Sequence, residues 1–238
     1  MLTGKRAAAA HLYFLSGAVR FGEFELSVHR DNPDLPKSPI YLHYPKAGAL
    51  GSGYLDGLHR LLGDLLAELL RAEEIKWDYL AAVPRGALPL GERMFQSLLH
   101  PELGVRTIAP RLLQFGKEEH PGGGTVFTAP EGRLEPGAQL VIVEDHTSGG
   151  RNKKLIRAAA EAAGLVVRDM LTIVDRQQGG VQAMAHEGVR LHALYTLDEL
   201  LDFGLEQMYI DTDTAERVRA YIRENQLWTL SSDPPVIL

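Results

Sequence analysis

One short segment, residues 140–150, limits the possible folds of this chain more than any other. Residues 140–143 are Leu-Val-Ile-Val, a run typical of a buried strand, and the run ends abruptly in Glu144 and Asp145. A polar stretch with two glycines follows, and residues 152–163 then have the apolar spacing of a helix. A buried strand that passes through a short loop into a helix is the repeating unit of a parallel α/β sheet.

The polar residues of this segment have a chemical use. In an open parallel sheet, ligands bind beyond the carboxyl ends of the strands, and the unpaired N–H groups at a helix start attract phosphate. Glycines let the backbone approach an anion, and Thr147 and Ser148 add hydroxyl donors. Glu144 and Asp145 would repel a bare phosphate, so they are expected to face sugar hydroxyls or a metal. The combination suits a ribose phosphate, although an acidic helix cap followed by a turn uses the same residue types.

The rest of the chain alternates strand patterns with helix patterns. Strands are predicted over residues 21–28, 39–44, 78–83, 105–113, 140–143, 166–174 and 189–195. Helices are predicted over residues 5–20, 54–74, 91–100, 152–163, 197–203 and 214–224. This alternation predicts an α/β fold with a mainly parallel, twisted sheet and helices on both faces. Residues 1–45 are expected to form a small N-terminal hood, and residues 46–238 the α/β core with a C-terminal helix.

Composition excludes several classes of protein and site. Of the 238 residues, 45% are hydrophobic and 24% are charged, which is ordinary for a globular protein with a core. The net charge is -6 and no basic cluster is present, so a nucleic-acid partner is not expected. The absence of cysteine excludes disulfides and thiolate catalysis, and the dispersed histidines do not form a zinc-binding pattern. No segment has the length and apolarity of a membrane span, and we expect the protein in the cytoplasm.

Residues 114–125 form a charged segment that is rich in glycine. Gly116 and residues 122–124 are glycines, and Lys117 and His120 lie between them. A flexible loop of this length is uncommon in a compact domain and is often an active-site lid. A plain surface hairpin has the same composition, and the segment alone does not decide between the two.

Five motifs, spread over most of the chain, carry a resemblance to a known family. They are Phe-Gly-Glu-Phe at residues 21–24, Ser-Pro-Ile-Tyr at 38–41, the Pro-Arg-Gly loop at 83–90, the acidic segment at 144–150 and Asp-Arg-Gln-Gln-Gly-Gly at 175–180. The acidic segment is similar to the motif with which type I phosphoribosyltransferases bind 5-phosphoribosyl-1-pyrophosphate (PRPP). Within that family, the last motif resembles the strand end of the orotate phosphoribosyltransferases.

The resemblance implies a magnesium-dependent transfer of the phosphoribosyl group from PRPP to orotate, with release of pyrophosphate. Orotate N1 attacks C1 of PRPP through a transition state like an oxocarbenium ion, so catalysis is mainly positioning and charge stabilisation. Arg176 would pair with the orotate carboxylate or ring oxygens. The resemblance also implies a homodimer in which the glycine-rich loop reaches into the partner's active site. The residues implied in substrate binding are Glu144, Asp145, Thr147, Ser148, Gly149, Gly150, Arg176, Arg85 and Tyr41, and those implied in catalysis are Asp145, Lys117 and His120.

Several family cations are absent from this chain. The family's glycine-rich loop has an Arg-Lys pair that is missing here, which leaves Lys117 and His120 as the cationic candidates. The lysine of the family's first strand is missing too, and residues 30–37 form an insertion after it. His146 stands where the family has two residues, and Arg151 replaces a small hydroxyl residue. Two alternatives therefore stay open: a catalytically weakened protein that binds PRPP or a nucleotide, and a phosphoribosyltransferase for another base.

Overall fold

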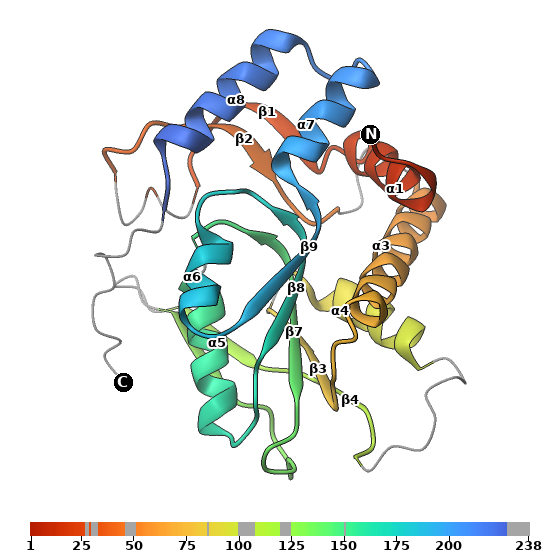
Figure 1. Cartoon of the computed structure of the whole chain (residues 1–238), viewed down its shortest axis with the longest axis vertical. Coiled ribbons are helices and arrows are strands. Elements are labelled where there is room, and N and C mark those ends of the chain that lie inside the picture. The colour runs from red at the N-terminus through yellow and green to blue at the C-terminus, as the bar shows by residue number, and fades with distance from the viewer. Residues whose placement is uncertain are drawn as a thin grey trace.

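The computed structural model describes residues 1–26, 29, 33–45, 51–84, 86–99, 108–119, 125–149 and 151–227. Its centre is a five-stranded sheet in which every neighbouring pair of strands is parallel. In spatial order (Figure 1), the strands are β4 (Arg111–Leu113), β3 (Tyr79–Ala82), β7 (Leu140–Thr147), β8 (Asp169–Asp175) and β9 (Arg190–Thr196). The predicted parallel α/β sheet is therefore confirmed.

Helices cover both faces of this sheet. The described helices are α1 (Gly4–Leu15), α3 (Ser52–Ala72), α4 (Leu88–Leu98), α5 (Arg151–Ala162), α6 (Gly180–His186), α7 (Leu197–Glu206) and α8 (Thr212–Glu224). Val141 and Val143 of β7 pack in an apolar cluster with α1, α3, α4 and α7, whereas Leu140 and Ile142 pack in a second cluster with α5 and α6. Alternate residues of a strand point to opposite faces, so the apolar run before the acidic segment fills both layers.

The hood, residues 1–45, contains α1, β1 (Val19–Phe24) and β2 (Ser38–Leu42), and α8 from the C-terminal part of the chain packs against it. β1 pairs antiparallel with β2, and α8 contacts β2. Figure 1 shows β1, β2 and α8 together at the end of the molecule where β9 runs into α7, which is the carboxyl end of the sheet. The hood thus stands over the edge at which a parallel sheet binds its ligands. The predicted division of the chain at residue 45 stays a prediction.

The described part of the glycine-rich segment consists of two paired strands. β5 (Gly116–Glu119) pairs antiparallel with β6 (Thr125–Thr128), in a sheet separate from the central one. Phe115 and Phe127 are buried in the apolar cluster that contains α5, and this burial anchors both arms. The two arms are therefore paired strands, as in the hairpin alternative of the sequence analysis, and residues 120–124 lie outside the described part of the chain.

The acidic segment begins on a strand. The sequence predicts that this strand ends at residue 143, but β7 continues to Thr147. The extension forms because Glu144 and Thr147 still pair with β8, at Thr172 and Asp175. A neighbouring strand therefore supplies the backbone partners that the polar side chains alone do not reveal.

Two further elements differ from their predicted form. α6 has no counterpart among the predicted elements. This short helix starts directly after Gly179, whose φ of 95° suits glycine. The strand predicted over residues 105–113 is found as Arg111–Leu113, and residues 101–107 lie outside the described residues.

Candidate active site

The site is built at the carboxyl edge of the sheet, where β7 and β8 end side by side. The main-chain N–H of Arg176 donates to the carbonyl oxygen of Thr147 at 2.9 Å, which ties the two strand ends together. The start of α6 lies against the acidic segment, because a Cβ on Gly180 would overlap the side chain of Thr147 and the carbonyl oxygen of Ser148. Gly180, the second glycine of the Gly179-Gly180 pair, thus permits α6 to pack closely against Thr147 and Ser148.

Glu144 is held by a lysine from α5. The Lys153 side chain is only 3% exposed, and its Nζ contacts the carboxylate of Glu144 and lies 3.4 Å from the carbonyl oxygen of His146. Burial lowers the pKa of Lys153 to about 7, and the negative charge of Asp175 acts in the opposite direction. One carboxylate of the acidic segment therefore already has a protein cation as its partner.

Asp145 is held by the residue that follows it. Its Oδ1 accepts from the main-chain N–H of His146 at 2.9 Å, and its Oδ2 lies 3.2 Å from Nδ1 of the same histidine. Burial acts to raise the pKa of Asp145, but the contacts with His146 outweigh it and keep that pKa below its usual value. The loop after β3 also approaches, since a Cβ on Gly86 would lie 3.3 Å from Asp145 Oδ2.

The remaining residues of the acidic segment are closely packed. Thr147 is fully buried, and its hydroxyl oxygen has no hydrogen-bond partner among the described residues. Gly149 lies beneath the chain that follows α8, because a Cβ at this position would be 2.9 Å from Cβ of Leu227. Gly150 lies outside the described residues. The expected phosphate contacts of residues 147–150 stay a prediction.

Arg176 connects the core to the hood. The residue is 4% exposed, and its guanidinium donates to Oε1 of Gln178 and to Oγ of Ser38 on β2, both at 3.2 Å. Burial lowers the pKa of Arg176 to about 10, while Tyr221 and Tyr13 act in the opposite direction. The structure therefore places the expected orotate-binding arginine beside the strand of the Ser-Pro-x-Tyr motif.

The other predicted site residues lie on other strands or outside the described residues. Tyr41 lies on β2, with its ring centroid 5.6 Å from that of Phe24 in the neighbouring hood strand. Lys117 lies on β5 opposite Phe127, in the separate two-stranded sheet. Arg85 and His120 lie outside the described residues. The structure thus brings Glu144, Asp145, Thr147 and Arg176 to one edge.

Sequence reasoning misses two residues of this site. Lys153 carries no distinguishing signal, because Lys154 beside it has the same charge and forms a 3.5 Å ion pair with Glu187 instead. Tyr13 is the second, because its hydroxyl contacts the His146 ring from a helix that is more than a hundred residues away in sequence. The departure from the family pattern at His146 is the one signal that points to this contact.

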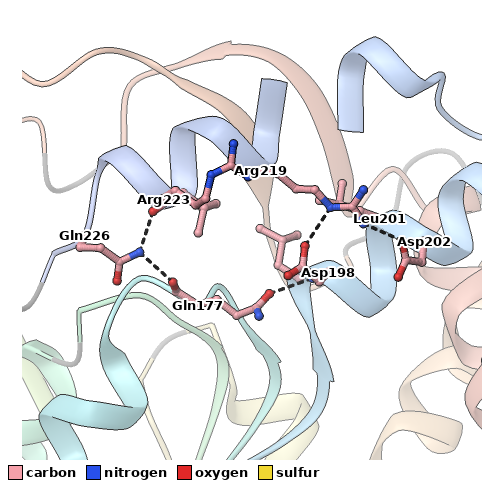
Figure 2. Close-up of a pocket in the computed structure, with 9 residues that line it drawn as sticks. Gln177, Asp198, Leu201, Asp202, Arg219, Arg223 and Gln226 are labelled. Carbon is pink, nitrogen blue, oxygen red and sulfur yellow. Dashed lines mark hydrogen bonds and ion pairs between the residues drawn. The ribbon is translucent and has the colours of Figure 1, made fainter. Parts of the chain in front are cut away.

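A pocket of about 460 Å³ lies between α7, α8 and the turn after β8 (Figure 2). Its polar groups are largely paired with each other: Arg219 donates to Asp198 at 3.0 Å, and Gln226 donates to the carbonyl oxygen of Gln177 at 3.1 Å. Its lining residues are Gln177, Leu197, Asp198, Leu201, Asp202, Arg219, Ile222, Arg223 and Gln226. None of residues 144–149, the described part of the acidic segment, contributes to this lining, which distinguishes the pocket from the site described above.

Comparison with known proteins finds orotate phosphoribosyltransferases and a uridine 5'-monophosphate synthase among the relatives of this chain. The chain is 32% identical to the orotate phosphoribosyltransferase of Cenarchaeum symbiosum over 185 residues, which cover 75% of this chain and 79% of that protein. It is 31% identical to the uridine 5'-monophosphate synthase of Bos taurus over 164 residues, 69% of this chain. The matched region makes up 32% of the bovine protein, so the chain corresponds to about a third of it. No protein-family model matches the chain.

Solved structures share the fold. The UMP synthase of Leishmania donovani superimposes with a TM-score of 0.70 and 25% identity, over 93% of this chain and 43% of that one. The orotate phosphoribosyltransferase of Aeropyrum pernix superimposes with a TM-score of 0.59 and 23% identity, over 82% of this chain and 97% of that one.

Together, the parallel sheet, the hood above its carboxyl edge and the acidic segment define a type I phosphoribosyltransferase. The sequence identity to the Cenarchaeum enzyme, over most of both chains, identifies the family within this class. The chain belongs to the orotate phosphoribosyltransferase family. Of the helices that the structure describes, none has the length and apolarity needed to cross a membrane.

Proposed function

We propose that this chain transfers the phosphoribosyl group of PRPP to orotate and releases pyrophosphate, a step of pyrimidine nucleotide synthesis. The observation that carries the proposal is the meeting of the acidic segment with Arg176 at one sheet edge, in a chain of this family. A Mycobacterium tuberculosis orotate phosphoribosyltransferase of the same fold has been solved in complex with PRPP, which supports PRPP as the donor.

In the proposed reaction, orotate N1 bonds to C1 of the ribose while the bond from C1 to the pyrophosphate oxygen breaks. Pyrophosphate keeps the electron pair, and the N1 proton of orotate passes to water. Positive charge develops on the ribose ring, so a fixed carboxylate at the ribose hydroxyls stabilises the transition state. Asp145 has this role in the proposal, with the N–H groups of residues 147–150 at the 5-phosphate and Arg176 at orotate.

Mg²⁺ is proposed to bind together with PRPP. Within the described part of the chain, no group of three or more His, Asp and Glu side chains is placed to hold a metal ion. Mg²⁺ would therefore be coordinated mainly by oxygens of the pyrophosphate and the ribose, which suits its preference for hard oxygen ligands. When bound, it would neutralise charge on the leaving group.

The glycine-rich segment is proposed as a lid that acts across a homodimer, because the family resemblance implies shared sites. Lys117, on one arm of the β5–β6 hairpin, would bring positive charge to pyrophosphate, and His120 would assist. Lys117→Ala should then lower turnover far more than PRPP affinity. Mixing this variant with Asp145→Asn should restore some activity, because one hybrid site holds both intact halves. A monomeric protein, or mixtures without recovery, would exclude the shared site.

The proposed function is tested by measuring pyrophosphate release from PRPP with orotate and with a panel of other bases. Among the bases tested, only orotate is expected to support pyrophosphate release from PRPP. Release with a different base would make the chain a phosphoribosyltransferase for that base, and tight PRPP binding without release would make it a binding protein, as the missing family lysines suggest.

The double variant Glu144→Gln with Asp145→Asn should abolish PRPP binding, and unchanged affinity would remove the central role of the acidic segment. A cytoplasmic location stays a prediction.

A further inference from the structure

A chain of buried polar contacts runs from Asp145 to the hood. Nδ1 of His146 lies 3.2 Å from Asp145 Oδ2, and Nε2 of the same ring contacts the hydroxyl of Tyr13 on α1. The Tyr13 hydroxyl also donates to the carbonyl oxygen of His43, next to β2, at 3.2 Å. Tyr13 is fully buried and the His146 side chain is 10% exposed, so water competes little for these contacts.

The hydrogens of this chain have few possible arrangements. A carboxylate only accepts, so Nδ1 of His146 must carry the hydrogen that points to Asp145. The single hydroxyl hydrogen of Tyr13 then goes either to Nε2 of His146 or to the carbonyl of His43. In the first arrangement Nε2 accepts from the hydroxyl; in the second, Nε2 must carry a hydrogen of its own and donate to the hydroxyl oxygen. In either case Asp145 is fixed at its two oxygens by the ring and by the main-chain N–H of His146.

We propose that Tyr13 and His146 are positioning residues that hold the Asp145 carboxylate in the orientation needed at the ribose. The inference rests on the proposed role of Asp145 in the transfer reaction. A carboxylate held before the substrate binds needs no reordering during the reaction, and misplacement of about 1 Å can cost roughly 100-fold in rate. The same contacts couple α1 of the hood to the acidic segment of the core.

Tyr44 provides a matched control in the same surroundings. It is 4% exposed, and its hydroxyl has no hydrogen-bond partner among the described residues. Burial raises the pKa of Tyr44, Arg93 opposes this change and Asp145 adds to it, so the ring lies within the electrostatic reach of the same carboxylate. Tyr44→Phe removes one buried tyrosine hydroxyl, as Tyr13→Phe does, but it breaks none of the contacts that hold Asp145.

The experiment compares steady-state kinetics of the full chain and of Tyr13→Phe, Tyr44→Phe and Asp145→Asn. Tyr13→Phe should lower kcat/KM for PRPP by about 5- to 30-fold and leave KM for orotate within about twofold, because only the ribose contact is misplaced. Tyr44→Phe should change neither constant by more than about twofold. Equal losses in the two tyrosine variants, or no loss in Tyr13→Phe, would overturn the inference.

Substitutions of His146 separate positioning from packing. His146→Leu removes both ring nitrogens and should lower kcat/KM for PRPP at least as much as Tyr13→Phe. His146→Asn places an amide N–H near the position of Nδ1 and should recover part of the loss, whereas a purely structural effect predicts no such rescue. Wild-type activity in Asp145→Asn would instead show that the proposed role of Asp145 is wrong. If the chain binds PRPP without turnover, the same order of variants is expected in PRPP dissociation constants measured by calorimetry, and a different order overturns the inference.

Discussion

Glu144 and Asp145 are neighbours in the sequence, yet different parts of the molecule hold their side chains. Glu144 is 12% exposed and contacts Lys153 of α5, on the core side. Asp145 is 24% exposed and contacts His146, which contacts Tyr13 of the hood helix α1. The two carboxylates of one motif therefore differ in their protein partners and in their exposure. Glu144 is committed to a protein cation, and Asp145 stays more accessible to a substrate.

The contact with Lys153 serves to orient Glu144 more than to stabilise the fold. Burying a lysine and a carboxylate removes hydration from both, and their mutual attraction repays this cost only with good geometry and further hydrogen bonds. Losing one partner is nevertheless expensive, because the other charge is then left in place without compensation. Variants of Asp145, Glu144 and Lys153 can therefore separate a structural carboxylate from a substrate-binding one.

The largest expected effect is on activity at Asp145. Asp145→Asn should lower kcat by roughly 100-fold or more, the size expected when one fixed group that stabilises transition-state charge is lost. Glu144→Gln should cost less activity. The glutamine amide oxygen still accepts a hydrogen bond from Lys153, and the more exposed Asp145 carboxylate is unchanged. Steady-state kinetics with PRPP and orotate measure both variants. Equal losses would show that the two carboxylates share one task.

The second prediction concerns stability at Lys153. Lys153→Met should lower the free energy of unfolding by roughly 2–4 kcal/mol, because the carboxylate of Glu144 loses its partner. Urea denaturation below about pH 7, where Lys153 with its pKa of about 7 carries its charge in the fold, measures the change. Adding Glu144→Gln to the variant should recover much of the loss. Lys154→Met is the matched control: its ion pair with Glu187 spans 3.5 Å at the helix surface and should contribute less than about 1 kcal/mol. A similar loss in both lysine variants would contradict the special place of Lys153.

A third, smaller effect should appear in the pH dependence of stability. Burial lowers the pKa of Lys153 to about 7 in the folded protein, from a usual value of 10.5. Between these values the unfolded chain binds more protons, so the free energy of unfolding should rise with pH, by roughly 1 kcal/mol per pH unit. The slope should be smaller in Lys153→Met, and urea denaturation at several pH values between about 7 and 9 measures it. Identical slopes would show that Lys153 keeps its proton in the fold.

The sequence predicts the sheet and its acidic edge well, because both depend on local patterns. The apolar run at residues 140–143 predicts a buried strand, and the acidic segment after it predicts where a ligand would bind. The partners of that segment are not predictable in the same way. Lys153 and Tyr13 are ordinary helix residues until the fold brings them to β7, and Lys154 has the same local signal as Lys153. Periodicity predicts which face is buried, but not which buried side chain meets a particular carboxylate.

The smallest effect should come from the other contact between hood and core. Ser38 of β2 accepts from the Arg176 guanidinium at 3.2 Å and donates to the carbonyl oxygen of Ile40 at 2.7 Å. Ser38→Ala should raise KM for orotate by about 2- to 5-fold, the worth of one modest hydrogen bond, and leave KM for PRPP unchanged. Tyr13→Phe should instead lower kcat/KM for PRPP and leave KM for orotate within about twofold, because it acts on Asp145. A double variant with additive losses would show that the hood positions the two substrates through separate contacts, whereas strong non-additivity would show that α1 and β2 move as one unit.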